Sequence, residues 1–476
     1  MARGARADKS APAFDPFIVT TSLDKTDAET RKFIRSHVMR GKNKGKLMPR
    51  KGKKSRALDS DATPQSSPAS LVQHEDPGWE HWQLVSPRKV ASELSLFRYT
   101  QELSPPMKEL IFRAFTVVKP SMYAVQLFGV DEEQSSGMFC FSGLSSHPAM
   151  VPSLLFTAQA FRDMSLGFEL GSLAHTHLAK TLRLLKTSLE DEEEATSYST
   201  MVVVSSLATA AIILGDLETA GKHLDGLQRM VEVRGGLGSL GPVNMITYKA
   251  LTLDLGLAMG TGSKPRFGLG DISWSPQFAR GPSGRRFCEL EALQPRPDPR
   301  LLNIWADLRE FSKAANDVEQ KKIPMKHGLF YQLSTSTLYR LLRLRFDPKS
   351  LSELLRLSLL AYTKTLMIRL PGLGKKMTYL AGQLEIAFLP LPATGHGGSP
   401  LLLWALVIST ISVFEDCEQE WLQRGISGLM AELELHTWLE VKTVLKRFLW
   451  VDGLHDQQGK AIFEKLSSIT LPNQHE

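Results

Sequence analysis

The sequence predicts an all-α fold: a large multi-helix array or bundle preceded by a disordered basic N-terminal arm. Apolar residues recur at the 3.6-residue period of a helix from about residue 86 to the C-terminal region. The period-two alternation of a strand is confined to short stretches such as 124–129 and 138–141. Near the N-terminus, Lys, Arg, Gly and Pro gather without an apolar period, a composition typical of a disordered chain.

Residues 1–58 are predicted to form the basic arm, which includes one short amphipathic helix at about 27–39. Thr26 and Glu29 have the spacing of a capping box, in which each side chain accepts a hydrogen bond from the other residue's backbone N–H. An apolar stripe follows at helical spacing and ends at Gly41.

The charge of the chain is concentrated in this arm. Residues 31–58 contain twelve Lys or Arg and neither Asp nor Glu. Since the whole chain has a formal net charge of +7, the remainder carries −5. Such a segment binds anionic partners, so nuclear targeting or nucleic-acid contact is expected of ten residues: Arg35, Arg40, Lys42, Lys44, Lys46, Arg50, Lys51, Lys53, Lys54 and Arg56. A membrane surface and an inert tail are the alternatives.

A linker and a helical domain follow the arm. Residues 59–85 lack an apolar period and are rich in Ser and Pro, so we expect a disordered linker there. The helical domain is expected to cover 86–476. Gly and Pro interrupt its helical period at about 260–299 and 391–399, which we therefore assign to loop insertions.

Within the domain, the helical period is clearest in four segments: 158–189, 196–214, 218–233 and 351–368. Thr437 and Glu440 form a second capping box near the C-terminus. An apolar stripe follows it, made of Trp438, Val441, Leu445 and Phe448. Two apolar runs, 201–214 and 401–414, are shorter than the roughly 20 residues that a membrane span needs, so both are predicted to be buried helices.

The sequence has no motif that predicts an enzyme, a cofactor or a metal site. Gly372–Lys375 resembles part of a phosphate-binding loop, but Lys376 stands where Ser or Thr would bind magnesium. We interpret the acidic run Glu190–Glu194 as a solvated turn and not as a metal-binding cluster. His175 and His177 are two residues apart and point to different faces of a helix. The three cysteines are too far apart in sequence to indicate a zinc site, so we expect a non-enzymatic protein without cofactors.

Several segments occur in an order that is similar to a known family. They are FIVTTSLDKTDAETRKFIRSHVMRGKNKGK from Phe17, HLDGLQRMVEVRGGLGSL from His223, the helix and turn marked by Asp254, Ala258 and Pro265-Arg266-Phe267, LLRLSLLAYTKTLMI from Leu354, LLLWALVISTISVF from Leu401, and FLWVDGLHDQQGKAIFEKL from Phe448. In this order they resemble the fungus-specific transcription factor domain, and in particular members that lack a zinc cluster, some of them labelled tachykinin family. The residues that carry this signature as marks of the fold are Arg35, Ser36, His37, Val38, Met39, His223, Leu224, Leu227, Arg234, Gly235 and Gly236.

The resemblance implies a nuclear regulatory domain that modulates transcription. Related factors carry a zinc binuclear cluster with six closely spaced cysteines, which three isolated cysteines cannot build. The expected location is the nucleus, and the expected partners are proteins of transcription regulation, a nuclear import receptor and weakly bound non-specific DNA, with no membrane partner. The alternatives are a cytosolic helical scaffold that binds RNA or acidic partners, and a helical small-molecule sensor or enzyme.

Overall fold

In the computed structural model of the chain, helices are the regular secondary structure of the described residues. These are 102–115, 147–241, 245–268, 270, 272–279, 290, 293–321, 327–367, 377–389 and 398–470. Contacts divide the chain into two units, Met1–His74 and Glu75–Glu476, and all described residues belong to the second. No β-strand occurs among them, so the predicted all-α fold is confirmed. The predicted arm, its short helix, the linker and the two candidate strand stretches lie outside the described residues.

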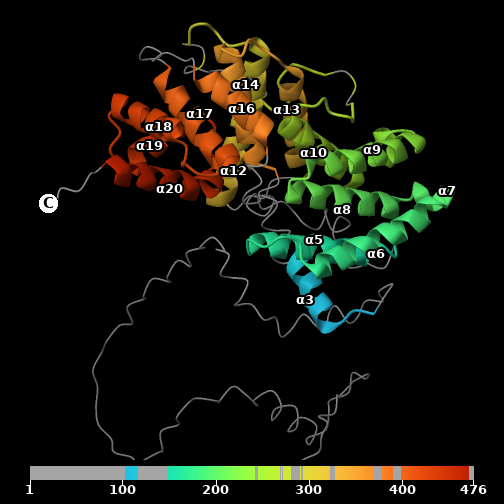
Figure 1. Ribbon diagram of the computed structural model, residues 1–476. Helices are drawn as coiled ribbons and strands as arrows, with labels where there is room; N and C mark the ends of the chain where they lie inside the picture. The colour runs from blue at the N-terminus through green and yellow to red at the C-terminus, as the bar shows by residue number, and fades with distance from the viewer. Residues whose placement is uncertain are drawn as a thin grey trace, which may run out of the picture. The chain divides into compact units, whose positions relative to one another are not determined.

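The first group of helices is coloured blue to green in Figure 1. It consists of α3 (Pro105–Arg113), α5 (Met150–Ser165), α6 (Ser172–Leu189), α7 (Glu192–Ala195), α8 (Tyr198–Leu214), α9 (Leu217–Val233), the 3₁₀ turn η6 (Leu237–Leu240) and α10 (Met245–Thr261). Helix α5 packs against α3, α6 and α8, while α9 and α10 pack against α8 and against each other. The contact between α3 and α5 has a small apolar core of its own.

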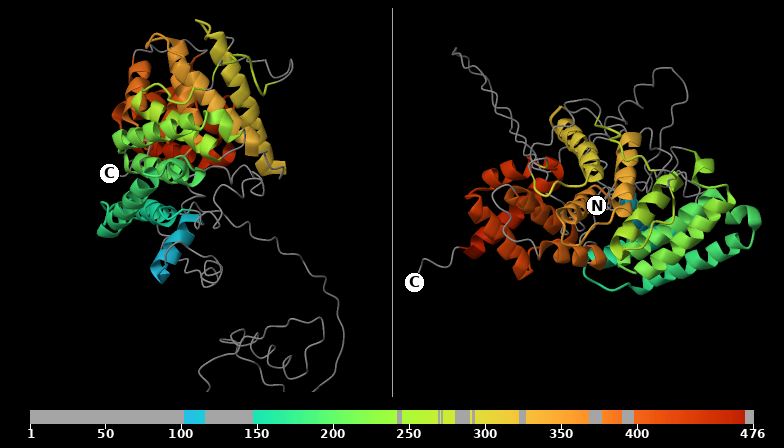
Figure 2. Two further views of the ribbon diagram at one scale, coloured as in Figure 1. Left: turned by 90° about the vertical axis from the view of Figure 1, so that its right-hand side faces the viewer. Right: turned by 90° about the horizontal axis from the view of Figure 1, so that it is seen from above.

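The second group is coloured yellow to red. It consists of α12 (Pro299–Lys321), α13 (His327–Arg343), α14 (Leu351–Thr365), α16 (Thr378–Phe388), α17 (Ser399–Ser409), the π-helical turn η8 (Thr410–Phe414), α18 (Glu420–Glu432), α19 (Trp438–Leu445) and α20 (Asp452–Thr470). Helix α10 joins the two groups through contacts with α13 and α16. In Figures 1 and 2, α12 to α16 lie between the green helices and the red ones.

The most apolar helices lie in the interior. Helices α8 and α17 are apolar around nearly their whole circumference, and almost all of their residues are buried. A helix without a polar face has to be covered on every side, and each leucine buried in this way contributes about 1.5–3 kcal/mol. The predicted burial of the runs 201–214 and 401–414 is therefore confirmed. Among the described helices, none combines the length and the apolar character that crossing a bilayer requires.

The segment 158–189, in which the helical period is clear, is divided between two helices. Helix α5 ends at Ser165, and α6 begins at Ser172. The break occurs at Gly167, whose φ of +74° lies in the left-handed region. The backbone N–H of Phe168 reaches back to the Asp163 carbonyl at 2.9 Å, the closing bond of a Schellman motif. The apolar period continues across this glycine, so the spacing by itself does not mark the break.

Helix starts follow their capping residues closely. Helix α8 begins one residue after Ser197, whose hydroxyl accepts a hydrogen bond from the Thr200 N–H at 3.2 Å. The capping box of Thr437 and Glu440 is present at the start of α19 and is confirmed. Phe448 is buried but lies beyond the end of α19, so the predicted stripe continues past its helix.

Candidate functional site

The residues predicted to contact import receptors or nucleic acid lie outside the described residues. The same holds for the signature residues Arg35, Ser36, His37, Val38 and Met39. The remaining six signature residues lie on α9 and in the turn that ends it. They are His223, Leu224, Leu227, Arg234, Gly235 and Gly236.

The signature leucines of α9 face the core. Leu224 and Leu227 are fully buried, and Val231 lies on the same face, as the spacing predicts. His223 is half-buried beside them, and burial lowers the pKa of its imidazole, although Asp216 opposes this change. Asp216 itself begins the helix, because its carboxylate accepts the Thr219 N–H at 3.0 Å. These residues therefore fix the position of α9 and contact the core.

The glycines that follow α9 end the helix. Gly235 and Gly236 have φ angles of +94° and +90°, in the region that favours glycine. Their N–H groups donate to the carbonyls of Glu232 and Val231, both at 2.9 Å, which is the Schellman arrangement. Arg234 donates to the Thr196 carbonyl at 2.9 Å and ties this turn to the residue two before α8. Helix α9 thus ends at Val233, the last residue of the segment 218–233 in which the helical period is clear.

The loop after α10 is bound to α9 and α10 by one carboxylate of each helix. Asp254 of α10 is buried, and its Oδ2 accepts the N–H groups of Arg266 at 2.5 Å and Phe267 at 2.9 Å. The Arg266 Nε donates to Asp225 of α9 at 2.5 Å. A Cβ on Gly221 of α9 would lie 3.1 Å from the Arg266 guanidinium, so a larger residue here would require the arginine to shift. Burial raises the pKa of Asp254, and the hydrogen bonds from Arg266 and Phe267 oppose that rise.

A second buried carboxylate holds the next part of the same loop. Asp307 of α12 accepts the N–H groups of Gln277, Phe278 and Ala279 with Oδ1, at 2.8–3.2 Å. Its Oδ2 accepts a hydrogen bond from Arg340 of α13. The loop predicted between α10 and α12 is therefore bound to the helices at Asp254 and again at Asp307.

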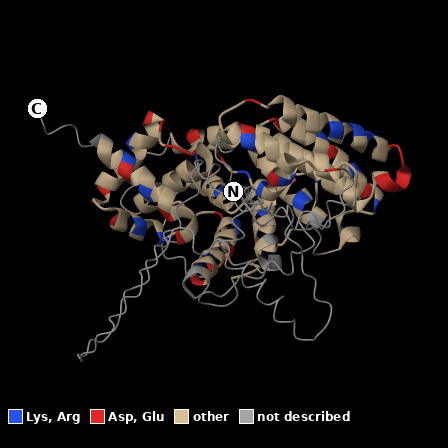
Figure 3. Cartoon of the chain, turned by 90° about the horizontal axis from the view of Figure 1, so that it is seen from below, with Lys and Arg blue, Asp and Glu red and all other residues tan. Residues whose placement is uncertain are grey.

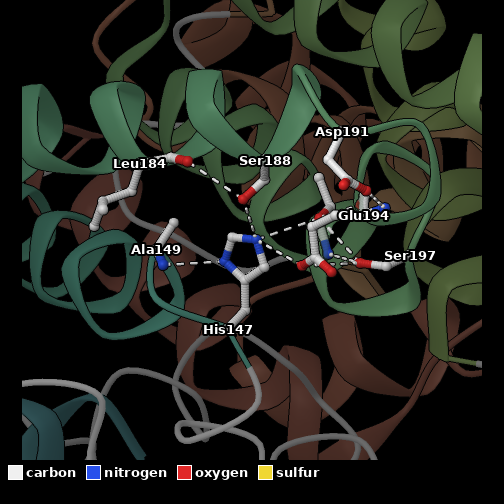
Figure 4. A network of polar contacts seen from close by, with 8 residues as sticks. His147, Ala149, Leu184, Ser188, Asp191, Glu194 and Ser197 are labelled. Carbon is white, nitrogen blue, oxygen red and sulfur yellow. Dashed lines mark hydrogen bonds and ion pairs between the residues drawn. The ribbon is translucent and has the colours of Figure 1, made fainter.

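A buried histidine links four helices of the first group, and Figure 4 shows its polar contacts. His147 precedes α5, and its Nδ1 accepts the Ala149 N–H at 3.0 Å. Its Nε2 lies 2.9 Å from the Ser188 hydroxyl near the end of α6. The same nitrogen lies 3.3 Å from a carboxylate oxygen of Glu194 in α7 and from the Thr200 hydroxyl in α8.

The geometry of this cluster does not suit nucleophilic catalysis. Nδ1 accepts the Ala149 N–H, so the neutral ring carries its proton on Nε2 and donates it toward Ser188. A general base would need an unprotonated nitrogen at the serine, with the acid on the opposite nitrogen. Glu194 instead approaches the same nitrogen as Ser188. The cluster therefore joins α5, α6, α7 and α8, and it does not activate a serine.

A similar arrangement anchors the C-terminal helix. His455 of α20 is buried; its Nδ1 accepts the Val451 N–H, and its Nε2 contacts the Thr365 hydroxyl at 2.9 Å. Asn316 of α12 donates to the Trp450 carbonyl at 2.9 Å and accepts the Asp452 N–H at 2.8 Å. The segment that begins FLWVDGLH is thus attached to the central helices α12 and α14.

Metal ligands do not cluster in the part of the chain that the structure describes. No group of three or more His, Cys, Asp or Glu side chains there could hold a metal ion. His175 is exposed and His177 is buried, so the two side chains occupy different faces of α6 as predicted. Cys417 is a buried free thiol.

Comparison with known proteins does not assign the chain to a family. No family model matches the chain, and neither a curated protein nor a solved structure matches it. The polar clusters at His147, Asp254, Asp307 and His455 were not predicted as sites from the sequence. Asp254 and His455 lie in segments of the resemblance, whereas His147 and Asp307 contact residues whose separation in the sequence gives no local signal.

Proposed function

We propose that the chain is a non-enzymatic nuclear protein that regulates transcription through protein contacts of its helical domain, without a zinc cluster of its own. The contact among Asp225, Asp254 and Arg266 carries this proposal. These residues belong to two sequence elements of the resemblance, the one from His223 and the helix with its following turn. Arg266 joins the two elements, because its guanidinium pairs with the exposed Asp225 of the first and its backbone N–H is bound by the buried Asp254 of the second.

The chemistry of the described polar groups supports a binding role. The buried carboxylates Asp254 and Asp307 are occupied by backbone N–H groups and arginines, and His147 and His455 accept backbone N–H groups. Groups bonded in this way stabilise the helix packing. None of these four side chains is placed as a free acid, base or nucleophile, so partner binding is the function that fits the domain best.

In this proposal, the basic segment, residues 31–58, is the nuclear import signal. Its twelve cations without a single acid are the composition of import signals and of segments that contact nucleic-acid phosphates. An import receptor with an acidic groove is the first partner this segment would meet. In the proposal, the segment brings the helical domain to chromatin and adds weak, sequence-independent affinity for DNA.

Imaging of a fluorescent fusion in the cells that produce this protein tests the proposal. The full chain is compared with a variant in which Arg50, Lys51, Lys53 and Lys54 are replaced by alanine. The matched control replaces four cations of the helical domain that lie on its exposed surface, Lys222, Arg229, Arg424 and Lys460. We expect nuclear signal from the full chain and the control, and reduced nuclear signal from the variant. Cytosolic signal from the full chain would overturn the proposed nuclear role.

A further inference from the structure

Helix α6 is covered on one side only by the described elements. Its buried residues, Ala174, His177, Thr181 and Leu185, face α5 and α8. On the outside, Leu182 and Leu189 are 43% and 49% exposed. Figures 1 and 2 show α6 at the margin of the helical array, with α5 and α8 on its inner side. With respect to the described residues, the outer face of α6 is therefore exposed.

The exposed residues of α6 follow the spacing of a helix-binding seam. His175, Ala179, Leu182, Lys186 and Leu189 are exposed, and they are separated alternately by four and three residues. This spacing keeps side chains on one stripe, where they meet the apolar stripe of a second helix. The small side chain of Ala179 allows a second helix to approach closely.

The charge of this face indicates the chemistry of the partner. Between Ser172 and Leu189 the helix contains no Asp or Glu. Arg183 and Lys186 are exposed and form no ion pair with a described residue. Figure 3 shows the basic residues along this helix and the acidic turn α7 beyond it. A partner with acidic flanks would neutralise these cations, whereas a second copy of α6 would repel them.

The seam is also fixed in place at both ends. At its N-terminal end, the Asp163 carboxylate of α5 accepts the Gly171 N–H at 3.0 Å. At its C-terminal end, Ser188 is bound to His147, which precedes α5. A surface that is already ordered before binding loses little conformational freedom when a partner docks.

We infer that the outer face of α6 is a docking site for an amphipathic helix of another protein, whose apolar stripe is flanked by Asp or Glu. Leu182 and Leu189 contact the apolar stripe, and Arg183 and Lys186 pair with the acidic flank. Glu192 to Glu194 of α7 repel acidic residues at one end of the seam, which sets the register of the partner. The inference rests on the proposed function in one respect: this face would be the protein contact through which the proposed regulator acts.

Peptide binding to the purified full-length protein tests the surface. Two labelled helical peptides share one leucine stripe at helical spacing, and one carries Glu and the other Lys at the flanking positions. Fluorescence anisotropy should show binding of the Glu peptide that weakens as salt is raised. The double variant Leu182→Glu, Leu189→Glu should bind it at least roughly tenfold more weakly.

A charge reversal separates docking from loss of folding. The variant Arg183→Glu, Lys186→Glu should lose the Glu peptide and gain the Lys peptide, a result that misfolding cannot produce. Leu439→Glu and Arg424→Glu are the controls, because Leu439 is 72% exposed on α19 and Arg424 is exposed on α18. Both controls should bind like the wild type.

Three outcomes would overturn the inference. They are equal binding of the two peptides, failure of the Glu peptide to bind, and unchanged binding by the charge-reversed variant. A dimer in sedimentation velocity that disappears in the Leu182→Glu, Leu189→Glu variant would instead assign the face to a second copy of the chain. Nuclear imaging does not depend on this face, so the proposed location and the docking site can fail separately.

Discussion

The Asp307 Oδ2 accepts a hydrogen bond from the Arg340 Nη2 at 2.7 Å, and both side chains are buried, with exposed fractions of 0% and 1%. The two partners differ in their other contacts. Asp307 also accepts the N–H groups of three consecutive loop residues, 277–279, whereas Arg340 Nε and Nη1 have no hydrogen-bond partner among the described residues. The Asp307 carboxylate thus binds both the loop and α13, whereas the Arg340 guanidinium has the carboxylate as its one hydrogen-bond acceptor among the described residues.

This difference predicts unequal effects of the two truncations. Asp307→Ala leaves a buried guanidinium uncompensated and three N–H groups without an acceptor, so it should lower the free energy of unfolding by about 3–5 kcal/mol. Arg340→Met leaves Asp307 bound to the loop and should cost only about 1–2 kcal/mol. Urea denaturation of both variants measures the difference. Equal losses would show that the loop contacts of Asp307 contribute little.

The pKa of His147 predicts a loss of stability in acid. Burial lowers this pKa in the folded protein, although Glu194 opposes the change. The unfolded chain therefore binds a proton near pH 6.5, before the folded one does, and the free energy of unfolding falls as the pH decreases from about 6.5 toward the folded pKa. Each such proton contributes a slope of about 1.4 kcal/mol per pH unit. His177 and His223, whose pKa values burial also lowers, add to the slope.

Urea denaturation between about pH 7.5 and pH 5 checks the sign. His147→Gln should unfold more easily at pH 7.5 and should show a shallower decline in acid than the wild type. Ser188→Ala is the matched control, because it removes a hydrogen bond to the ring and keeps the titrating group. A decline in the His147→Gln variant as steep as that of the wild type would exclude His147 as a source of the acid sensitivity.

The ends of helices were predictable from the sequence because their chemistry is local. Thr437 and Glu440 are three residues apart, and the capping box they predict is present. Gly235 and Gly236 end α9 for the same kind of reason. The clusters at His147 and Asp307 were not predictable, because their partners lie 41 and 33 residues away. Only the packing of α5 on α6, and of α12 on α13, brings those groups together.

A close approach between a glycine and two tryptophans predicts an overpacking effect. A Cβ on Gly459 of α20 would lie 2.7 Å from the Trp438 ring and 2.9 Å from the Trp450 ring. Gly459→Ala should therefore lower the free energy of unfolding by about 1–3 kcal/mol, since both rings would have to shift. Gly428 of α18 is the control, because it is exposed and a Cβ there meets nothing within 4 Å.

Gly428→Ala should raise the free energy of unfolding by about 0.5–1 kcal/mol, because alanine loses less conformational freedom than glycine in a helix. Urea denaturation of the two variants measures the expected decrease in the free energy of unfolding for Gly459→Ala and the expected increase for Gly428→Ala. The fluorescence of the tryptophans should also change in Gly459→Ala. A stabilised Gly459→Ala variant would mean that the contact between α19 and α20 is looser than the distances indicate.

The basic segment predicts a defined response of DNA binding to salt. If about six of its cations contact phosphates, the affinity for a duplex of arbitrary sequence should fall with a log-log slope near −5, through release of counterions. Replacing Arg50, Lys51, Lys53 and Lys54 by alanine removes up to four of these contacts and should make the slope shallower by up to about 4. Fluorescence anisotropy across a salt series measures both slopes.

The charge-reversed α6 variant, Arg183→Glu with Lys186→Glu, is the control for this titration. It changes the net charge by the same amount as the four alanines do, but it does so on the helical domain. If DNA contact belongs to the basic segment, this variant should keep a slope near that of the wild type. A shallower slope in the α6 variant, together with an unchanged slope in the alanine variant, would move the DNA contact from the arm to the helical domain.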